Sequence, residues 1–114
     1  MAEDCLFCGM ASGAIPARVL AENDLAFAIR DIHPRAPLHV LVIPRKHIAD
    51  AREIEAGHAE TLAALFLLAS QVAREEGVSE SGYRLAFNVG EAAGMTISHL
   101  HIHLLGKRQL GPEG

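Results

Sequence analysis

Apolar residues recur along the chain with two different periods, which predict short strands in most of the sequence and one long helix in its middle. The run His39–Ile43 is a continuous, largely β-branched segment closed by Pro44, which is typical of a buried strand. From about His58 to Glu76, apolar residues instead recur every three or four positions, as on one side of an amphipathic helix. The residues expected on this buried stripe are Leu62, Leu65, Phe66, Ala69, Val72 and Ala73.

Shorter segments complete the predicted order of elements. Residues Cys5–Gly13 have room for one short helix, and the two prolines within Asp31–Leu38 make that stretch a shaped loop. Because the strands occur in pairs around one long helix, without βαβ alternation, we expect a single α+β domain over residues 1–114. It would contain a five-stranded antiparallel sheet, the long helix and the short N-terminal helix. The other four expected strands are Arg18–Ala21, Leu25–Ile29, Tyr83–Val89 and His99–Leu105.

Composition narrows the function classes. Half of the 114 residues are apolar and a fifth are charged, which is the range of an ordinary globular domain. The net charge is −4 and no run of Lys and Arg occurs, so a nucleic-acid partner is not expected. No window approaches about 18 consecutive apolar residues, which argues against a membrane partner. The first residues are acidic where a secretion signal needs basic ones, so we expect a cytoplasmic protein.

Three of the seven histidines lie together in the last predicted strand. Side chains of a strand alternate between its faces, so His99, His101 and His103 are expected on one face and the apolar residues between them on the other. Successive histidines would then lie about 6.6 Å apart along the chain. Imidazoles spaced in this way can act in series on one small anion.

Three interpretations of this cluster compete: a polar strand face without chemistry, a metal site, and metal-free catalysis on a phosphate. The stretch Gly90–Thr96 precedes the histidines and offers small residues, free backbone N–H groups and one hydroxyl, which suit an oxyanion. A hydrolytic zinc site would need a carboxylate base, and Glu91 is the only acid nearby. Neutral imidazole is nucleophilic near pH 7. These features favour phosphate chemistry.

The pattern H-x-H-x-H, followed by two apolar residues and Gly106 and preceded by a small-residue loop, resembles the signature of the histidine-triad (HIT) nucleotide-binding proteins, closest to their Hint-like branch. Three further blocks are similar in the same order: Asp31–Pro44, Gly82–Asn88 and Arg108–Leu110. The resemblance runs from about Cys5 to Gln109 and implies the HIT-like fold.

The resemblance implies a hydrolase of purine nucleoside 5′-phosphoramidates or related nucleotidyl conjugates. His101 matches the nucleophile, which forms a nucleotidyl-histidine before water releases AMP or GMP. His103 matches the residue that contacts the phosphate and the leaving group, and His39 matches a fourth histidine near the nucleophile. His99, the first histidine of the triad, completes the catalytic set. The alternatives are an AMP-binding regulator with vestigial turnover and a hydrolase or phosphorylase of dinucleoside polyphosphates.

The resemblance also implies how the nucleotide would bind. Asp31 matches the acid that binds the ribose hydroxyls, and Ile32 matches a wall of the base pocket. A homodimer is implied as well, with helix and strand edges joining and the C-terminal tail reaching toward the partner's site. Three residues depart from the family pattern: Met95, Ser98 and Glu91, which adds negative charge. All three are expected to affect the turnover rate and the leaving-group preference. The remaining expected nucleotide-binding residues are Asn88, Gly94, Thr96 and Ile97, together with His101 and His103.

The cysteine pair Cys5-x-x-Cys8 has three interpretations: a redox pair, a disulfide or half of a zinc site. Several histidines could complete a zinc site, and spacing alone does not choose among them. The resemblance implies His47 and His99, which would make a closed structural site, with no metal or other cofactor needed for catalysis. His33 and His58 are expected on the surface, and Arg74–Glu76 is expected to be a solvated helix end.

Overall fold

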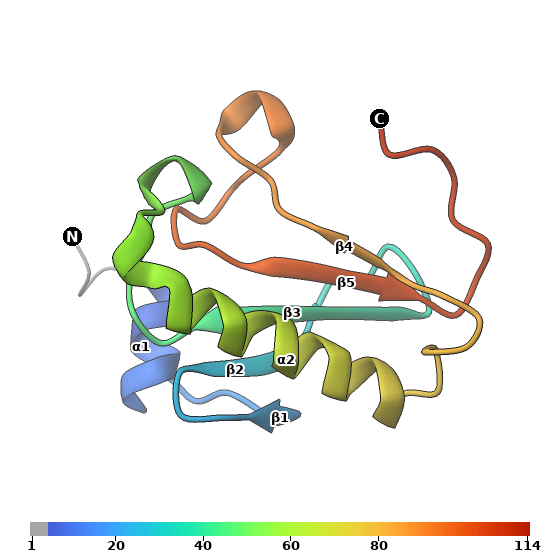
Figure 1. Cartoon of the computed structure of the whole chain (residues 1–114), viewed down its shortest axis with the longest axis horizontal. Helices are drawn as coiled ribbons and strands as arrows, with labels where there is room; N and C mark the ends of the chain where they lie inside the picture. The colour runs from blue at the N-terminus through green and yellow to red at the C-terminus, as the bar shows by residue number, and fades with distance from the viewer. Residues whose placement is uncertain (1–4) are drawn as a thin grey trace.

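The computed structural model describes residues 5–114, which form a five-stranded antiparallel sheet with one long helix packed along one of its faces (Figure 1). The strand order is β1-β2-β3-β5-β4, so the edge strands are β1 and β4. This is the α+β architecture that the sequence predicts. The strands are β1 (Ala21–Glu22), β2 (Ala26–Arg30), β3 (Leu38–Pro44), β4 (Arg84–Ala86) and β5 (Ile102–Gly106), and the helices are α1 (Leu6–Ser12) and α2 (Ala59–Glu75).

The two faces of the sheet are covered differently, and this determines where a site can form. All seven residues of β3 are buried, so both faces exclude water along the central strand. Val40 and Val42 belong to the core that α2 covers, whereas Leu41 and Ile43 pack on the other face with Phe7 of α1. Helix α1 is short and lies at one end of that second face (Figure 1). The rest of the second face is available for a site.

Helix α2 confirms the predicted amphipathic pattern, but its buried stripe is rotated from the expected one. Phe66 was expected in the core, whereas its side chain is 48% exposed and its ring lies 6.1 Å from the ring of Phe87. An α-helix turns by about 100° per residue. With Leu65 at the centre of the contact, Phe66 therefore points sideways, and Leu68 takes the buried position. The buried residues of α2 are Thr61, Leu65, Leu68, Ala69, Val72 and Ala73.

The predicted strand boundaries are wrong at three places. Strand β1 contains only Ala21–Glu22, and β4 is limited to Arg84–Ala86. The last strand begins at Ile102, because the backbone before it makes other bonds: His99 N–H donates to the carbonyl of Ile97, at 2.9 Å, and Leu100 N–H donates to that of Ile48, at 2.6 Å. His99 and His101 therefore precede the regular ladder.

Two residues expected at the surface make specific contacts within the fold. His58 is buried, and its Nδ1 accepts the backbone N–H of Glu55 at 3.2 Å just before α2 begins. Glu76 forms ion pairs with Arg30 at 2.9 Å and with Lys107 at 3.2 Å, so it joins the end of α2 to the sheet. His33 is exposed, as expected. Within residues 5–114, no helix is long and apolar enough to cross a membrane.

Candidate active site

Three imidazoles meet on the face of the sheet opposite α2. His103 lies on β5, paired with Leu41 of β3 and with Ala86 of β4, and His101 directly precedes that strand. The ring centroids of His101 and His103 are 4.9 Å apart, and that of His39, on β3, is 5.2 Å from that of His103. All three residues are buried. The alternation predicted from the sequence therefore brings His101 and His103 together, and the fold adds His39 from a neighbouring strand.

The hydrogen bond of His101 determines which of its ring nitrogens carries the proton. Nδ1 lies 2.7 Å from the backbone carbonyl of His99. A carbonyl can only accept, so Nδ1 is the donor, and the Nε2 of the neutral ring keeps its lone pair. The ring of Phe7 meets the His101 ring edge-on at 5.3 Å between centroids, which limits its rotation. His101 thus has the tautomer and the orientation that a nucleophile requires.

The same reasoning applies to His39 and His103. The backbone N–H of Arg35 donates to His39 Nδ1 at 3.0 Å, so His39 carries its proton on Nε2. That Nε2–H points to His103 Nδ1, at 2.9 Å, and lies 3.4 Å from Oδ2 of Asp31. Because His103 Nδ1 accepts, the proton of a neutral His103 is on Nε2.

Burial keeps the histidines of the site uncharged at neutral pH. It lowers the pKa of His39 and of His101 below the usual value of 6.5. For His103, burial together with the nearby His101, Arg35 and His39 lowers the pKa to about 4, although Asp31 acts in the opposite direction. A neutral imidazole can act as a nucleophile or as a hydrogen-bond donor, which are the two uses that the tautomers above permit.

These lowered pKa values predict that acid destabilises the fold well before carboxylates titrate. As the pH falls below about 6.5, unfolded histidines bind protons while His103 in the folded chain stays neutral until about pH 4. The free energy of unfolding should therefore decrease across this window. The decrease is measured as a fall in melting temperature between pH 7.5 and pH 4.5. The melting temperature of the variant His103→Asn should change less with pH than that of the wild type, whereas the control His33→Ala, at an exposed position, should behave as the wild type does. A wild-type melting temperature that does not change with pH would contradict the prediction.

The residues expected to contact phosphate lie on the segment between β4 and β5. Asn88 Nδ2 lies 3.5 Å from His103 Nε2, and Thr96 is exposed. Gly94 has a φ of +90°, a conformation that favours glycine, and closes the short 3₁₀ turn η4 (Glu91–Ala93). Ile97 packs against the apolar cluster around Phe7. The small-residue stretch before the histidines thus contains a 3₁₀ turn.

A pocket of about 580 Å³ lies beside the histidines, between the segment that follows α1 and the end of β2. It contains the two residues expected to bind a nucleoside. Asp31 is partly buried there, and its Oδ1 accepts the N–H of His33 at 2.8 Å. Ile32 is 87% exposed, so its apolar side chain is free to cover a ligand. The lining residues are Met10, Pro16, Ala17, Arg18, Val19, Leu20, Ile29, Arg30, Asp31 and Ile32.

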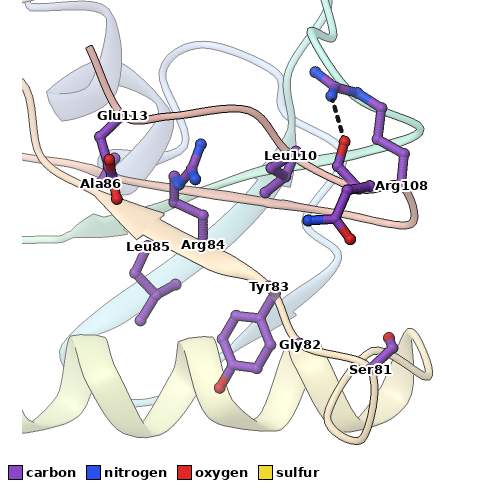
Figure 2. A pocket seen from close by; sticks show the side chains of 10 residues that line it. Ser81, Gly82, Tyr83, Arg84, Leu85, Ala86, Arg108, Leu110 and Glu113 are labelled. Atoms are coloured by element: carbon purple, nitrogen blue, oxygen red, sulfur yellow. Dashed lines mark hydrogen bonds between the residues drawn. The ribbon is translucent and has the colours of Figure 1, made fainter.

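A second pocket, of about 500 Å³, lies between β4 and the C-terminal tail (Figure 2). Arg84 crosses it and donates from Nη2 to the carbonyl of Gly111 at 2.6 Å, which holds the tail along β4. Its lining includes Tyr83, Leu110 and Glu113 but none of the residues expected in the site. The histidine face and this tail pocket are therefore separate features.

The four residues proposed as metal ligands converge at the N-terminal end of the site. Cys5 Sγ lies 3.2 Å from His99 Nδ1, Cys8 Sγ lies 3.2 Å from His47 Nδ1, and the two Nδ1 atoms are 3.1 Å apart. His99 Nε2 donates to the carbonyl of Pro44 at 2.9 Å, so its Nδ1 has a free lone pair directed at the other three ligands. Zinc bonds of about 2.0–2.3 Å place tetrahedral ligand atoms about 3.3–3.8 Å apart, which this cluster closely matches.

A second group, Asp31, His39 and His103, is also compact enough for a metal ion, but its hydrogen bonds do not fit one. His39 carries its proton on Nε2, the atom that faces the group, so it has no lone pair to offer there. The guanidinium of Arg35 lies 3.2 Å from His103 Nδ1 and would repel a cation. Of the three interpretations of the triad, these contacts argue against a metal site at this group and leave metal-free phosphate chemistry and a polar face without chemistry.

Two residues that shape the site, Phe7 and Arg35, are not among those expected from the sequence. Phe7 contacts both His99 and His101, at 5.7 and 5.3 Å between ring centroids, and its position between the cysteines could have suggested a role beside their site. Arg35 reaches His103 from the loop between β2 and β3. Nothing in the sequence pattern distinguishes Arg35 from a solvated cation.

The chain is similar to known proteins along most of its length. The sequence matches the HIT domain over residues 12–110. It is 39% identical to the purine nucleoside phosphoramidase of Escherichia coli K12, over 98% of this chain and 94% of that protein. A HIT family hydrolase from Legionella pneumophila has 48% identity and a TM-score of 0.92, covering 96% of this chain and 99% of the other. A zinc-bound histidine triad family protein from Mycobacterium smegmatis has 33% identity and a TM-score of 0.77, covering 95% and 78%.

The domain match extends over most of the chain, and both solved structures share its fold along nearly all of its length. Of the residues that carry the signature, His101 and His103 lie together on the face opposite α2, and His99 faces the cysteine pair and His47. The chain belongs to the histidine-triad (HIT) family.

Proposed function

We propose that this protein is a purine nucleotide-binding hydrolase that cleaves nucleoside 5′-phosphoramidates or related nucleotidyl conjugates and releases AMP or GMP. The observation that carries the proposal is the hydrogen bond from His101 Nδ1 to the His99 carbonyl, because it leaves Nε2 unprotonated in a buried neutral ring. The similarity to a purine nucleoside phosphoramidase supports the choice of substrate.

In the proposed first step, His101 Nε2 attacks the α-phosphorus. A bond forms between this nitrogen and phosphorus while the bond between phosphorus and the leaving nitrogen breaks, and the amine leaves with the electron pair of that bond and a proton from water. In the second step a water oxygen bonds to phosphorus and gives its proton to the hydroxide that the first step leaves, the bond to His101 breaks with its electron pair returning to Nε2, and the nucleoside monophosphate leaves. The covalent intermediate divides one difficult displacement into two easier ones.

The other site residues would hold the phosphate during both steps. His103 presents a protonated Nε2, with the Asn88 amide beside it, and both can donate to phosphate oxygens. We propose that the Thr96 hydroxyl donates a hydrogen bond to the phosphate oxygens from the other side, where the backbone at Gly94 also contacts them. His39 supports His103 through its Nε2–H. These donors would stabilise the charge that develops on the phosphate oxygens in the transition state.

The nucleoside would occupy the pocket beside Asp31. Its carboxylate can accept hydrogen bonds from both ribose hydroxyls, since each oxygen offers lone pairs. Ile32 and the apolar residues of the same pocket would contact the flat base, with Ile97 near the phosphate end. This arrangement binds a purine nucleoside through the ribose and an apolar surface, without any nucleic-acid contact.

We further propose a structural zinc ion held by Cys5, Cys8, His47 and His99. The four ligand atoms lie within 4.8 Å of one another, and the similar protein from Mycobacterium smegmatis is zinc-bound. Four protein ligands leave no open position for substrate, so the metal would stabilise the fold rather than take part in hydrolysis. It would join α1 to the segment that carries the triad.

A cytoplasmic homodimer is the proposed form of the protein. The edge strand β4 has free backbone groups on one side, and α2 exposes the apolar side chains of Phe66 (48%) and Leu67 (68%). A second copy that covers this strand and helix would remove both from water. A molar mass of one chain in solution, measured by light scattering at micromolar concentration, would contradict the proposal.

The rate of AMP release tests the proposed activity. Adenosine 5′-phosphoramidate, its guanosine counterpart and diadenosine tetraphosphate are each incubated with the protein, with and without inorganic phosphate, and AMP binding is measured by calorimetry. We expect the two phosphoramidates to be hydrolysed much faster than the dinucleotide. Tight AMP binding without release would favour the regulator instead, and faster cleavage of the dinucleotide would favour the polyphosphate hydrolase or phosphorylase.

A further inference from the structure

Arg35 is held at three points beside the histidines, although it lies in an exposed loop. Its backbone N–H donates to His39 Nδ1 at 3.0 Å, and its carbonyl accepts from Arg108 Nη2, also at 3.0 Å. Its own Nη2 lies 3.2 Å from His103 Nδ1. Pro34 and Pro37 flank the residue and restrict the loop further. A solvated cation would not be fixed in this way.

These contacts determine the state of two imidazoles at once. A guanidinium has only donors, so His103 Nδ1 must accept from Arg35. The backbone N–H of the same residue forces the proton of His39 onto Nε2, which also donates to His103 Nδ1. Two donors therefore converge on one nitrogen, and the remaining proton of His103 is placed on Nε2. This atom lies 3.5 Å from Asn88 Nδ2, and because both atoms are donors they do not bond to each other and both can donate to a ligand.

The charges around His103 also favour a neutral ring. The groups that face it are His39 on β3, Asp31 and Arg35 on the β2–β3 loop, His101 on its own segment, and the uncharged Asn88 amide. Asp31 alone favours the protonated ring, and Arg35 is the one permanent positive charge among them. A guanidinium remains charged at any pH at which the protein is folded. Removing it would take away one of the groups that lower the His103 pKa, while Asp31 would still act in the opposite direction.

We propose that Arg35 is a positioning residue that holds His103 as a neutral ring with its proton on Nε2, ready to donate to the phosphate of a bound nucleotide. The inference rests on the proposed function for its consequence in catalysis, but the link from Arg35 to His103 can be tested without any substrate. It assigns a role to a residue outside the H-x-H-x-H pattern. Arg35 does not itself contact the reacting atoms.

The test compares Arg35→Met, which keeps an apolar stem and removes charge and donors, with Arg35→Lys, which keeps the charge. Arg74→Met is the matched control, because Arg74 lies on α2 behind the sheet and, within residues 5–114, its side chain bonds only to Ser70. ¹⁵N spectra of labelled imidazoles report the tautomer and the titration of each ring, and the signal that disappears in His103→Asn identifies His103. Turnover of adenosine 5′-phosphoramidate is measured in parallel, as kcat and KM.

In Arg35→Met the His39 donor remains, so we expect the Nε2–H tautomer to be kept, with a shifted His103 Nδ1 signal because one of its two donors is lost, a raised His103 pKa, and a kcat about 10-fold or more below wild type with KM within about 3-fold. Arg35→Lys should keep His103 neutral at pH 6 and recover much of kcat, and Arg74→Met should match the wild type. Unchanged His103 spectra in Arg35→Met would overturn the proposal, as would a change in KM alone, which would mean that Arg35 binds substrate directly. An inactive wild type would refute the proposed function, and the spectra would still decide the role of Arg35.

Discussion

Replacement of His101 by Asn is expected to abolish turnover while leaving the fold intact. The Asn amide can donate to the His99 carbonyl as His101 Nδ1 does, at 2.7 Å in the wild type, so the buried hydrogen bond is kept. The variant has no nucleophilic nitrogen to attack phosphorus, and removal of a nucleophile typically costs about 10⁴–10⁶-fold in kcat. No other imidazole can take its place, because the one next to it, His103, presents a protonated Nε2.

Three measurements distinguish the loss of the nucleophile from the loss of the fold. AMP release and melting temperature are compared in His101→Asn and wild type, and the wild type is quenched during turnover for intact-mass analysis. We expect an AMP adduct on the wild type alone, with similar melting temperatures and AMP binding in both proteins. Appreciable turnover by the variant, or an adduct on it, would show that His101 is not the nucleophile.

Loss of the proposed zinc ion is expected to have the largest effect on stability. The cluster joins α1, the segment after β3 and the residues before β5, and metal binding by such a site contributes directly to folding. Loss of about 3 kcal/mol would lower the melting temperature of a domain of this size by about 10 °C or more. His99 would also be less fixed, and its carbonyl orients His101. We therefore expect a moderate decrease in kcat as well.

The variants His47→Ala and His33→Ala make a matched pair, since both remove an exposed histidine and only His47 belongs to the cluster. Zinc content, measured by atomic emission, should be one ion per chain in wild type and His33→Ala and much lower in His47→Ala. The melting temperature should fall only in His47→Ala and in chelator-treated wild type. A zinc-free wild type with the same melting temperature would contradict the structural role. Complete loss of activity on chelation, with the fold intact, would instead indicate a catalytic metal.

Most of the fold could be predicted because its signals are local. The apolar run at His39–Ile43 is long enough to be a buried central strand, and the helical period after His58 is long enough to be unambiguous. The short edge strands were harder to predict, because their ends depend on pairing with a neighbour rather than on their own residues. Phe66 was misplaced for a related reason: a helix with apolar residues on two adjacent sides does not reveal which side packs on the sheet.

For the site, the sequence by itself determined which residues are the candidates for the chemistry. Three histidines at alternate positions must lie on one side of an extended chain, and the blocks around them identify the family. Only the tertiary structure decided what each ring does. His99 donates to the Pro44 carbonyl and faces the cysteines, His101 donates to the His99 carbonyl, and His103 accepts from His39 and Arg35. A ring's tautomer and charge depend on the partners that surround it, and those partners are distant in sequence and meet only when the sheet has formed.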